Sequence, residues 1–227
     1  MKVRLVSYSK PSEFQTYEDG PLLGIQDLIA YCAKVSNPNH QINTATHERL
    51  LNYLIKHKHW SPFEMASACL EIDTTRDIAH QIVRHRSFSF QEFSQRYANV
   101  GEMGDMFEFA EARLQDTKNR QNSLESNDLA LDMGWKRKQQ QVIDVCQEVY
   151  TWALENGIAK EQARKILPEG LTKTRLYMHG TIRSWIHYIE LRGANGTQKE
   201  HMEIAHACAE AISLIFPNIK AYTNGEN

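Results

Sequence analysis

The stretch RHRSFSFQEFSQR, residues 84–96, marks a change from a helical to an alternating pattern, and this change indicates the fold class. The preceding run, residues 75–86, predicts a helix because its apolar side is formed by four residues at helical spacing: Ile78, Ala79, Ile82 and Val83. From Ser87 to Tyr97 the residues alternate as they do in a strand. A helix that leads directly into a strand predicts a mixed fold.

Similar patterns extend this mixture to both ends of the chain. Residues 1–8 and 66–73 alternate like strands, whereas helical spacing is found over 22–34, 50–55, 142–152, 182–191 and 204–215. The expected fold is α+β (an α/β mixture), with helices packed around a modest mixed or antiparallel sheet. We expect one domain over 1–227, in which the polar segment 114–138 forms an excursion or lid.

Composition narrows the class of function. The chain has 227 residues, of which 41% are hydrophobic and 24% charged, and its net charge is only −2. A general polyanion binder usually carries a large basic excess, so anion recognition should be local. The sequence has no run of about 18 apolar residues, which predicts no membrane helix. Its four cysteines are far apart, which favours free thiols in a reducing cytoplasm.

The residues of the opening stretch suit a ligand that carries phosphate. Arg84, His85 and Arg86 fan outward at about 100° per residue, although cations at a helix C-terminus are also explained by the helix dipole alone. In a strand, alternate residues share a face, which here would hold Phe88, Phe90, Glu92, Ser94 and Arg96. A carboxylate, a hydroxyl and a guanidinium beside these cations match a nucleotide, and an exposed strand face with a Glu–Arg pair is the simpler alternative.

Other segments repeat the theme of cations beside an apolar stripe. Arg183 and His187 lie four residues apart on the predicted 182–191 helix, and Arg192 follows them. Arg164 precedes a Pro-Glu-Gly turn, and His59 precedes Trp60. The sequence has no Walker loop and no GxGxxG, so side chains must bind any phosphate. The ten histidines show no familiar ligand spacing, and we expect no metal site.

RHR followed by seven residues and Ser94 resembles the signature of the flavin-dependent thymidylate synthase family. The segments HWSPFE, QRY, ARKILP and RSWIHYIELR resemble this family as well, so the similarity extends from Ser36 to the last helix. Two residues depart from it, Gln91 and His187, where other members have Asn. The segment GANGTQKEH, residues 193–201, is longer than the family pattern.

The resemblance implies an activity and an assembly. The family transfers a methylene group from methylenetetrahydrofolate to dUMP and produces dTMP. Reduced FAD supplies the hydride, and NADPH regenerates the flavin. The resemblance further implies a homotetramer whose active sites lie between subunits.

It also implies roles for individual residues. Flavin contacts are expected from Ser36, Ser61, Arg84, His85, Arg86, Glu92, Arg183 and His187. Contacts to dUMP are expected from Gln81, Arg84, Glu92, Ser94, Gln95, Arg96, Arg164 and Arg192. In the catalytic set, Arg192 would favour ionisation at uracil N3, Ser94 would orient the substrate rather than attack it, and His59 would lie near flavin and folate.

Two other hypotheses account for the same arginines. A nucleic-acid-binding module would use Arg84–Arg86 with Phe88 and Phe90 stacked on bases, but the nearly neutral charge disfavours it, and no nucleic-acid or membrane partner is expected. In a purely structural oligomer, the arginines would only form ion pairs across interfaces.

Overall fold

The computed structural model describes residues 1–12, 24–38, 41 and 43–223, and its centre is a four-stranded sheet. The strands lie in the order β1 (Lys2–Tyr8), β2 (Ser67–Thr75), β6 (Lys173–Thr181) and β3 (Ser89–Glu92), and all neighbours are antiparallel. The predicted α+β class with a modest antiparallel sheet is therefore confirmed.

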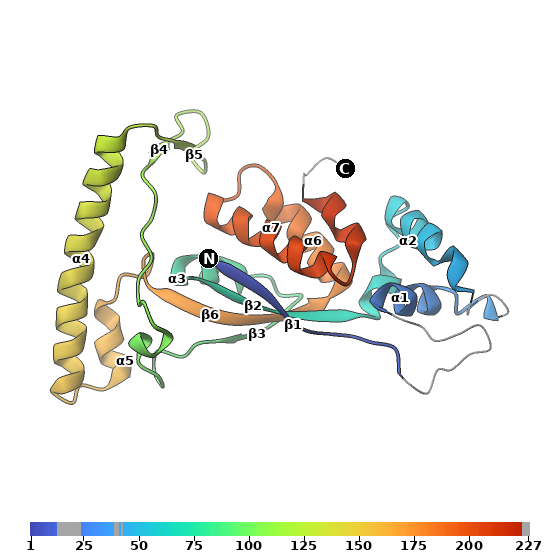
Figure 1. Ribbon diagram of the computed structural model, residues 1–227, viewed down its shortest axis with the longest axis horizontal. Helices are drawn as coiled ribbons and strands as arrows, with labels where there is room; N and C mark the ends of the chain where they lie inside the picture. The colour runs from blue at the N-terminus through green and yellow to red at the C-terminus, as the bar shows by residue number, and fades with distance from the viewer. Residues whose placement is uncertain (13–23, 39–40, 42, 224–227) are drawn as a thin grey trace.

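Helices cover one face of this sheet and extend beyond both of its ends (Figure 1). α6 (Ile182–Gly193) and α7 (Lys199–Ser213) pack on the face, and the short α3 (Arg76–Ile82) connects β2 to the turn before β3. α1 (Ile25–Ala33) and α2 (His47–Lys56) lie at one end, joined to the body by the 3₁₀ turn η3 (Ser61–Glu64). At the other end stand α4 (Leu129–Glu155), α5 (Lys160–Ala163) and the turn η5 (Arg164–Ile166). The remaining short elements are η2 (Thr44–Thr46), η4 (Val100–Met103), β4 (Arg113–Gln115), β5 (Ser123–Glu125) and η6 (Pro217–Tyr222).

The main core lies between the sheet and the two covering helices. Leu176 and Met178 of β6 point inward and are fully buried, while Arg175, Tyr177 and His179 point to the open face. Trp185 of α6 is also fully buried, and its indole nitrogen donates a hydrogen bond of 3.1 Å to the Ala68 carbonyl of β2. This bond ties α6 to the middle of the sheet.

Two predicted boundaries in the opening stretch are wrong. The helix expected over 75–86 ends at Ile82, so Arg84–Arg86 form the turn after α3. The strand expected over 87–97 pairs with β6 only from Ser89 to Glu92. The chain must reverse after α3 to bring β3 beside β6, and it turns again at Ser94, whose carbonyl accepts the Tyr97 amide at 3.0 Å.

The segment 114–138 is only partly the excursion that its polarity predicts. Its first half forms most of the two-stranded ribbon of β4 and β5. The remainder belongs to the 27-residue helix α4, whose start is capped by the Asp128 side chain accepting the Leu131 amide at 3.0 Å. β6, by contrast, was not predicted from the sequence at all.

Candidate active site

The turn Arg84–Arg86 and the end of α6 form the first polar cluster. The Arg192 Nε donates a hydrogen bond of 2.9 Å to His85 Nε2, which fixes this nitrogen as an acceptor. Burial and the Arg192 charge both lower the pKa of His85, so the imidazole is neutral at pH 7. Arg84 and Arg86 are exposed, and neither forms an ion pair with any described residue. The turn therefore presents the guanidinium groups of Arg84 and Arg86 to solvent, beside the Arg192 guanidinium that His85 holds in place.

The second cluster is a hollow of about 230 Å³ that we call the Gln95 pocket. Its lining residues are Arg76, Gln95, Arg164, Lys165, Leu167 and Glu169. Gln95 is only 3% exposed, and its Nε2 has no hydrogen-bond partner among the described residues. A buried amide without a partner is costly, and three cations around it favour an anion as the missing acceptor.

Glu92 lies next to this pocket, but Ser94 and Arg96 do not continue its strand face. Glu92 Oε1 accepts hydrogen bonds from Arg76 Nη1 at 3.2 Å and from Thr174 Oγ1 at 2.9 Å. Ser94 and Arg96 lie beyond the end of β3 and are exposed; Arg96 faces Glu161 at 3.6 Å. The prediction that all three line one side of a strand is wrong because β3 ends at Glu92.

Residues of η3 and α6 form a third cluster, the Trp60 corner. The His187 ring meets the Trp60 ring edge-on at 5.2 Å, and Arg183 Nη1 donates a hydrogen bond of 2.6 Å to Glu64 Oε1. Burial, reinforced by Arg183, lowers the pKa of His187. Other predicted flavin and folate contacts are exposed on nearby turns: Ser61 at the start of η3, His59 before it, and Ser36 after α1.

The hydrogen bonds and ion pairs of the described residues thus do not join all the predicted residues into one cluster. Within the described residues, no hydrogen bond or ion pair connects Ser94 or Glu92 with Arg192. Sequence reasoning missed several residues that contact the predicted ones or line a pocket with them: Arg76, Lys165, Thr174, Tyr188, Gln198 and His201. Arg76 is visible in hindsight as the cation that follows Thr74-Thr75 at the helix start.

Phe88 bears on the nucleic-acid alternative. Its ring packs against Trp185 at 4.8 Å and Tyr188 at 5.9 Å, at the edge of the main core. A ring held in this way is not free to stack on a base, as that alternative requires.

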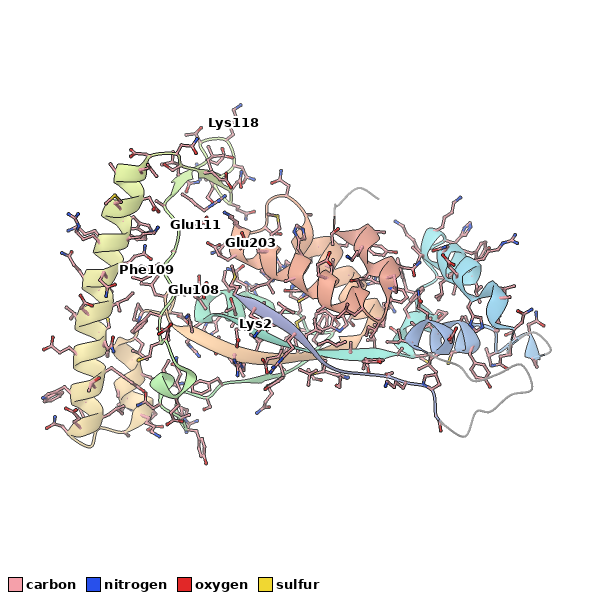
Figure 2. All side chains as sticks on the ribbon, in the orientation of Figure 1. Lys2, Glu108, Phe109, Glu111, Lys118 and Glu203 are labelled. Atoms are coloured by element: carbon pink, nitrogen blue, oxygen red, sulfur yellow. The ribbon has the colours of Figure 1, made fainter. Side chains whose placement is uncertain are left out.

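A second hollow contains none of the predicted residues. Figure 2 shows Glu108, Phe109 and Glu111 along the extended segment between the sheet and α4, with Glu203 on α7 nearby. The hollow measures about 160 Å³ and is also lined by Asp77, Glu200 and Lys199. Lys199 is paired with Glu111 at 2.7 Å. An excess of carboxylates makes this hollow unsuitable for phosphate.

Two further classes of feature were sought in the described part of the chain. It holds no group of three or more His, Cys, Asp or Glu side chains arranged to bind a metal ion. None of its helices combines the length and the apolarity that crossing a membrane requires.

Known proteins resemble this chain along nearly all of its length. The family model described as thymidylate synthase complementing protein (Thy1) matches residues 22–218. A probable flavin-dependent thymidylate synthase of Paramecium bursaria Chlorella virus 1 is 51% identical over 219 residues, covering 96% of this chain and 97% of that protein. The flavin-dependent thymidylate synthase of Synechocystis sp. is 48% identical over 221 residues, covering 97% and 98%.

A solved structure shares the fold. The UMP/dUMP methylase PolB from Streptomyces cacaoi, bound with 5-Br dUMP, superposes with a TM-score of 0.78 at 25% identity. The match covers 98% of this chain and 94% of that one.

Proposed function

The chain belongs to the Thy1 family and is a flavin-dependent thymidylate synthase, and from this premise we propose how its clusters divide the work. The reaction is the reductive methylation of dUMP to dTMP. Methylenetetrahydrofolate is the carbon donor, FAD carries the hydride, and NADPH reduces the flavin.

The Gln95 pocket binds the phosphate of dUMP. The observation that supports this assignment is the buried Gln95 Nε2, which has no hydrogen-bond partner among the described residues. Gln95 lines a hollow in which the cations Arg76, Arg164 and Lys165 outnumber the single carboxylate, Glu169. A phosphate brings acceptor oxygens to all four donors at once. Glu92, Ser94 and Arg96 lie in sequence around Gln95 and complete the contact to the nucleotide.

The cations of the first cluster and the Trp60 corner hold FAD. The fit rests on the exposed guanidinium groups of Arg84 and Arg86, which form no ion pair with a described residue and match a diphosphate. It also rests on His187 beside the Trp60 ring and on Arg183, one turn earlier on α6. Bound there, FAD would supply the hydride that converts the transferred methylene into a methyl group.

Arg192 activates the uracil ring. Its Nε is fixed on neutral His85, and its terminal Nη1 and Nη2 form no hydrogen bond within the described residues. A guanidinium stabilises negative charge at N3 but cannot act as a base at neutral pH. Ser94 binds and orients the substrate, because no described residue accepts the proton of its hydroxyl as a nucleophile requires. His59 lies on the exposed turn before η3, where folate approaches.

The separation of the clusters favours a site built from two subunits of a homotetramer. Gln81, Arg84 and Arg192 of one subunit meet the Gln95 pocket of another. This arrangement explains why, in the described part of one chain, the residues expected on one nucleotide form no hydrogen bond or ion pair with each other.

Helix α4 supports such an assembly. Val142, Val145, Val149 and Trp152 are 41–59% exposed and repeat at intervals of three, four and three residues, which we call the α4 seam. This spacing is that of a coiled-coil interface. A neighbouring side of α4, with Ile143, Tyr150 and Ala153, is already buried within its own chain.

Charge selects the orientation of the partner helix. The first half of α4 is basic on balance, with Lys136, Arg137 and Lys138 against one acid, Asp132, which pairs with Lys136 at 2.8 Å. The charged residues of the second half are all acidic: Asp144, Glu148 and Glu155. An antiparallel copy of α4 brings opposite charges together, and a parallel copy brings like charges together. We therefore assign the α4 seam to a two-fold contact between subunits.

The pocket assignment is tested by Arg164→Ala in an assay of dTMP formation with dUMP, methylenetetrahydrofolate, NADPH and FAD. Reactions that lack one of these four components serve as blanks. Loss of one charge-assisted contact should lower kcat/KM for dUMP by roughly 10- to 100-fold, mainly through KM. Arg49→Ala, on the exposed side of α2, is the matched control and should leave KM unchanged. An unchanged KM in Arg164→Ala, with wild-type activity present, would remove dUMP phosphate from the Gln95 pocket.

A further inference from the structure

His201 is a buried histidine that the proposed reaction does not use. It lies on the first turn of α7, inside the segment 193–201, and none of its surface is exposed. Its Nδ1 lies 3.3 Å from Gln81 Oε1, and its Nε2 lies 3.1 Å from the Tyr188 hydroxyl. His201 therefore links α6 and α7 to the side chain of Gln81 on α3.

The hydrogen-bond directions in this chain of groups follow from Gln81. Its Nε2 donates to Gln198 Oε1 at 2.7 Å, so its Oε1 faces His201. A carbonyl oxygen only accepts, which makes His201 Nδ1 the protonated nitrogen. His201 Nε2 is then unprotonated and accepts from the Tyr188 hydroxyl.

The surroundings keep His201 in this neutral form. The His85 ring centroid lies 6.3 Å away and Arg192 is bonded to His85, so a second positive charge is unfavourable. Burial is the largest cause, and together these groups lower the pKa of His201 to about 3. No carboxylate forms an ion pair with the ring within the described residues.

From this geometry we infer that His201 is a positioning residue, which with Tyr188 fixes the carboxamide of Gln81 in the orientation that dUMP requires. The inference rests on the proposed role of Gln81 as a dUMP contact. With Oε1 held by His201 and one N–H held by Gln198, Gln81 keeps one N–H for the nucleotide. The longer segment 193–201 thereby acquires a role, because it supplies both Gln198 and His201.

Paired amide substitutions separate orientation from packing. His201→Asn keeps a donor at the δ position facing Gln81, whereas His201→Gln carries its amide at the ε position. We expect the KM for dUMP to stay within about threefold of wild type in His201→Asn and to rise about tenfold or more in His201→Gln and His201→Phe. In all three, kcat should change less than KM and the flavin absorbance per chain should be unchanged.

Tyr188→Phe gives a second, milder test should the His201 variants fold poorly. Without the Tyr188 hydroxyl, Nε2 of His201 loses its donor, and only the Nδ1–H bond to Gln81 Oε1 still orients the ring. The KM for dUMP should rise, but by less than in His201→Phe, and the ¹⁵N shifts of His201 should still report the proton on Nδ1. Tyr222→Phe is the control, because it removes a buried hydroxyl that has no hydrogen-bond partner among the described residues.

The outcomes distinguish this inference from the proposed function. If Gln81→Ala raises the KM for dUMP while all His201 and Tyr188 variants keep the wild-type value, the positioning role is wrong and the dUMP assignment stands. If Gln81→Ala has no effect on KM, the role of Gln81 itself is wrong. If His201→Asn and His201→Gln lose melting temperature equally and share one KM, His201 only fills space.

Discussion

Gly180 of β6 lies under the ring of Phe88, and adding one methyl group there should disturb the turn Arg84–Arg86. A Cβ at position 180 would lie 2.6 Å from Phe88 Cε1 and closer still to Cδ1, so the ring must retreat by roughly 1 Å to reach ordinary contact. Trp185 and Tyr188 pack against the same ring, with centroids at 4.8 and 5.9 Å, and leave it little room.

The expected cost of Gly180→Ala is that of overpacking, about 1–3 kcal/mol. For a chain of this size, such a loss lowers the melting temperature by roughly 3–10 °C. The sign of the change in unfolding free energy is informative. Where no clash occurs, replacing a strand glycine by alanine stabilises a protein by about 0.4–1 kcal/mol, because it lowers the conformational entropy of the unfolded chain. Thermal melts of the FAD-loaded enzyme give the value directly.

A double-mutant cycle with Phe88→Ala isolates the clash. Once the ring is gone, Gly180→Ala should cost less than about 0.5 kcal/mol. Additive losses in the double variant, or a Gly180→Ala protein as stable as wild type, would refute the reasoning.

Three other predictions concern activation, assembly and pH. Arg192→Ala should keep its oligomer and its FAD but lose at least about 100-fold in dTMP turnover, because it removes the charge that stabilises the uracil anion; full turnover would contradict this role. Val145→Glu should lower the mass measured by light scattering, whereas Thr151→Glu, on another exposed side of α4, should not; an unchanged mass would exclude the α4 seam. The pKa of His201 falls from 6.5 to about 3 on folding, so the unfolded chain binds a proton that the folded chain refuses, and stability is lost as the pH falls below 6.5. Urea titrations should show a loss of about 2 kcal/mol between pH 6.5 and pH 5 that is absent in His201→Phe.

The sequence predicts those elements whose buried faces carry several large apolar residues. The helix with Trp185 and Ile186 and the strand with Leu70 and Ile72 were found because their periodicity is strong. β6 was missed because only two of its inward residues are large, the others being Thr174 and Gly180. An inward face with so few large side chains gives little of the alternation on which a strand prediction depends.

Candidate site residues could be proposed one by one from the sequence, but their grouping into clusters could not. Residues 84–96 carry an unusually high density of cationic and hydroxyl side chains, which marks them as candidates before the fold is known. Their grouping depends on where β3 ends, and a strand end is set by pairing with β6 rather than by local sequence. The Gln95 pocket also needs Arg76, which starts a helix, and Lys165, which lies in η5.

The stripe of valines and tryptophan along α4 has a consequence for the cell that makes this enzyme. If the proposed two-fold contact forms, a newly synthesised chain that has folded alone exposes this apolar band to water, where chaperones, proteases and other unassembled chains compete for it. Dilution lengthens that exposure and crowding with sister chains shortens it, so expression level should govern how much of the product survives as working enzyme.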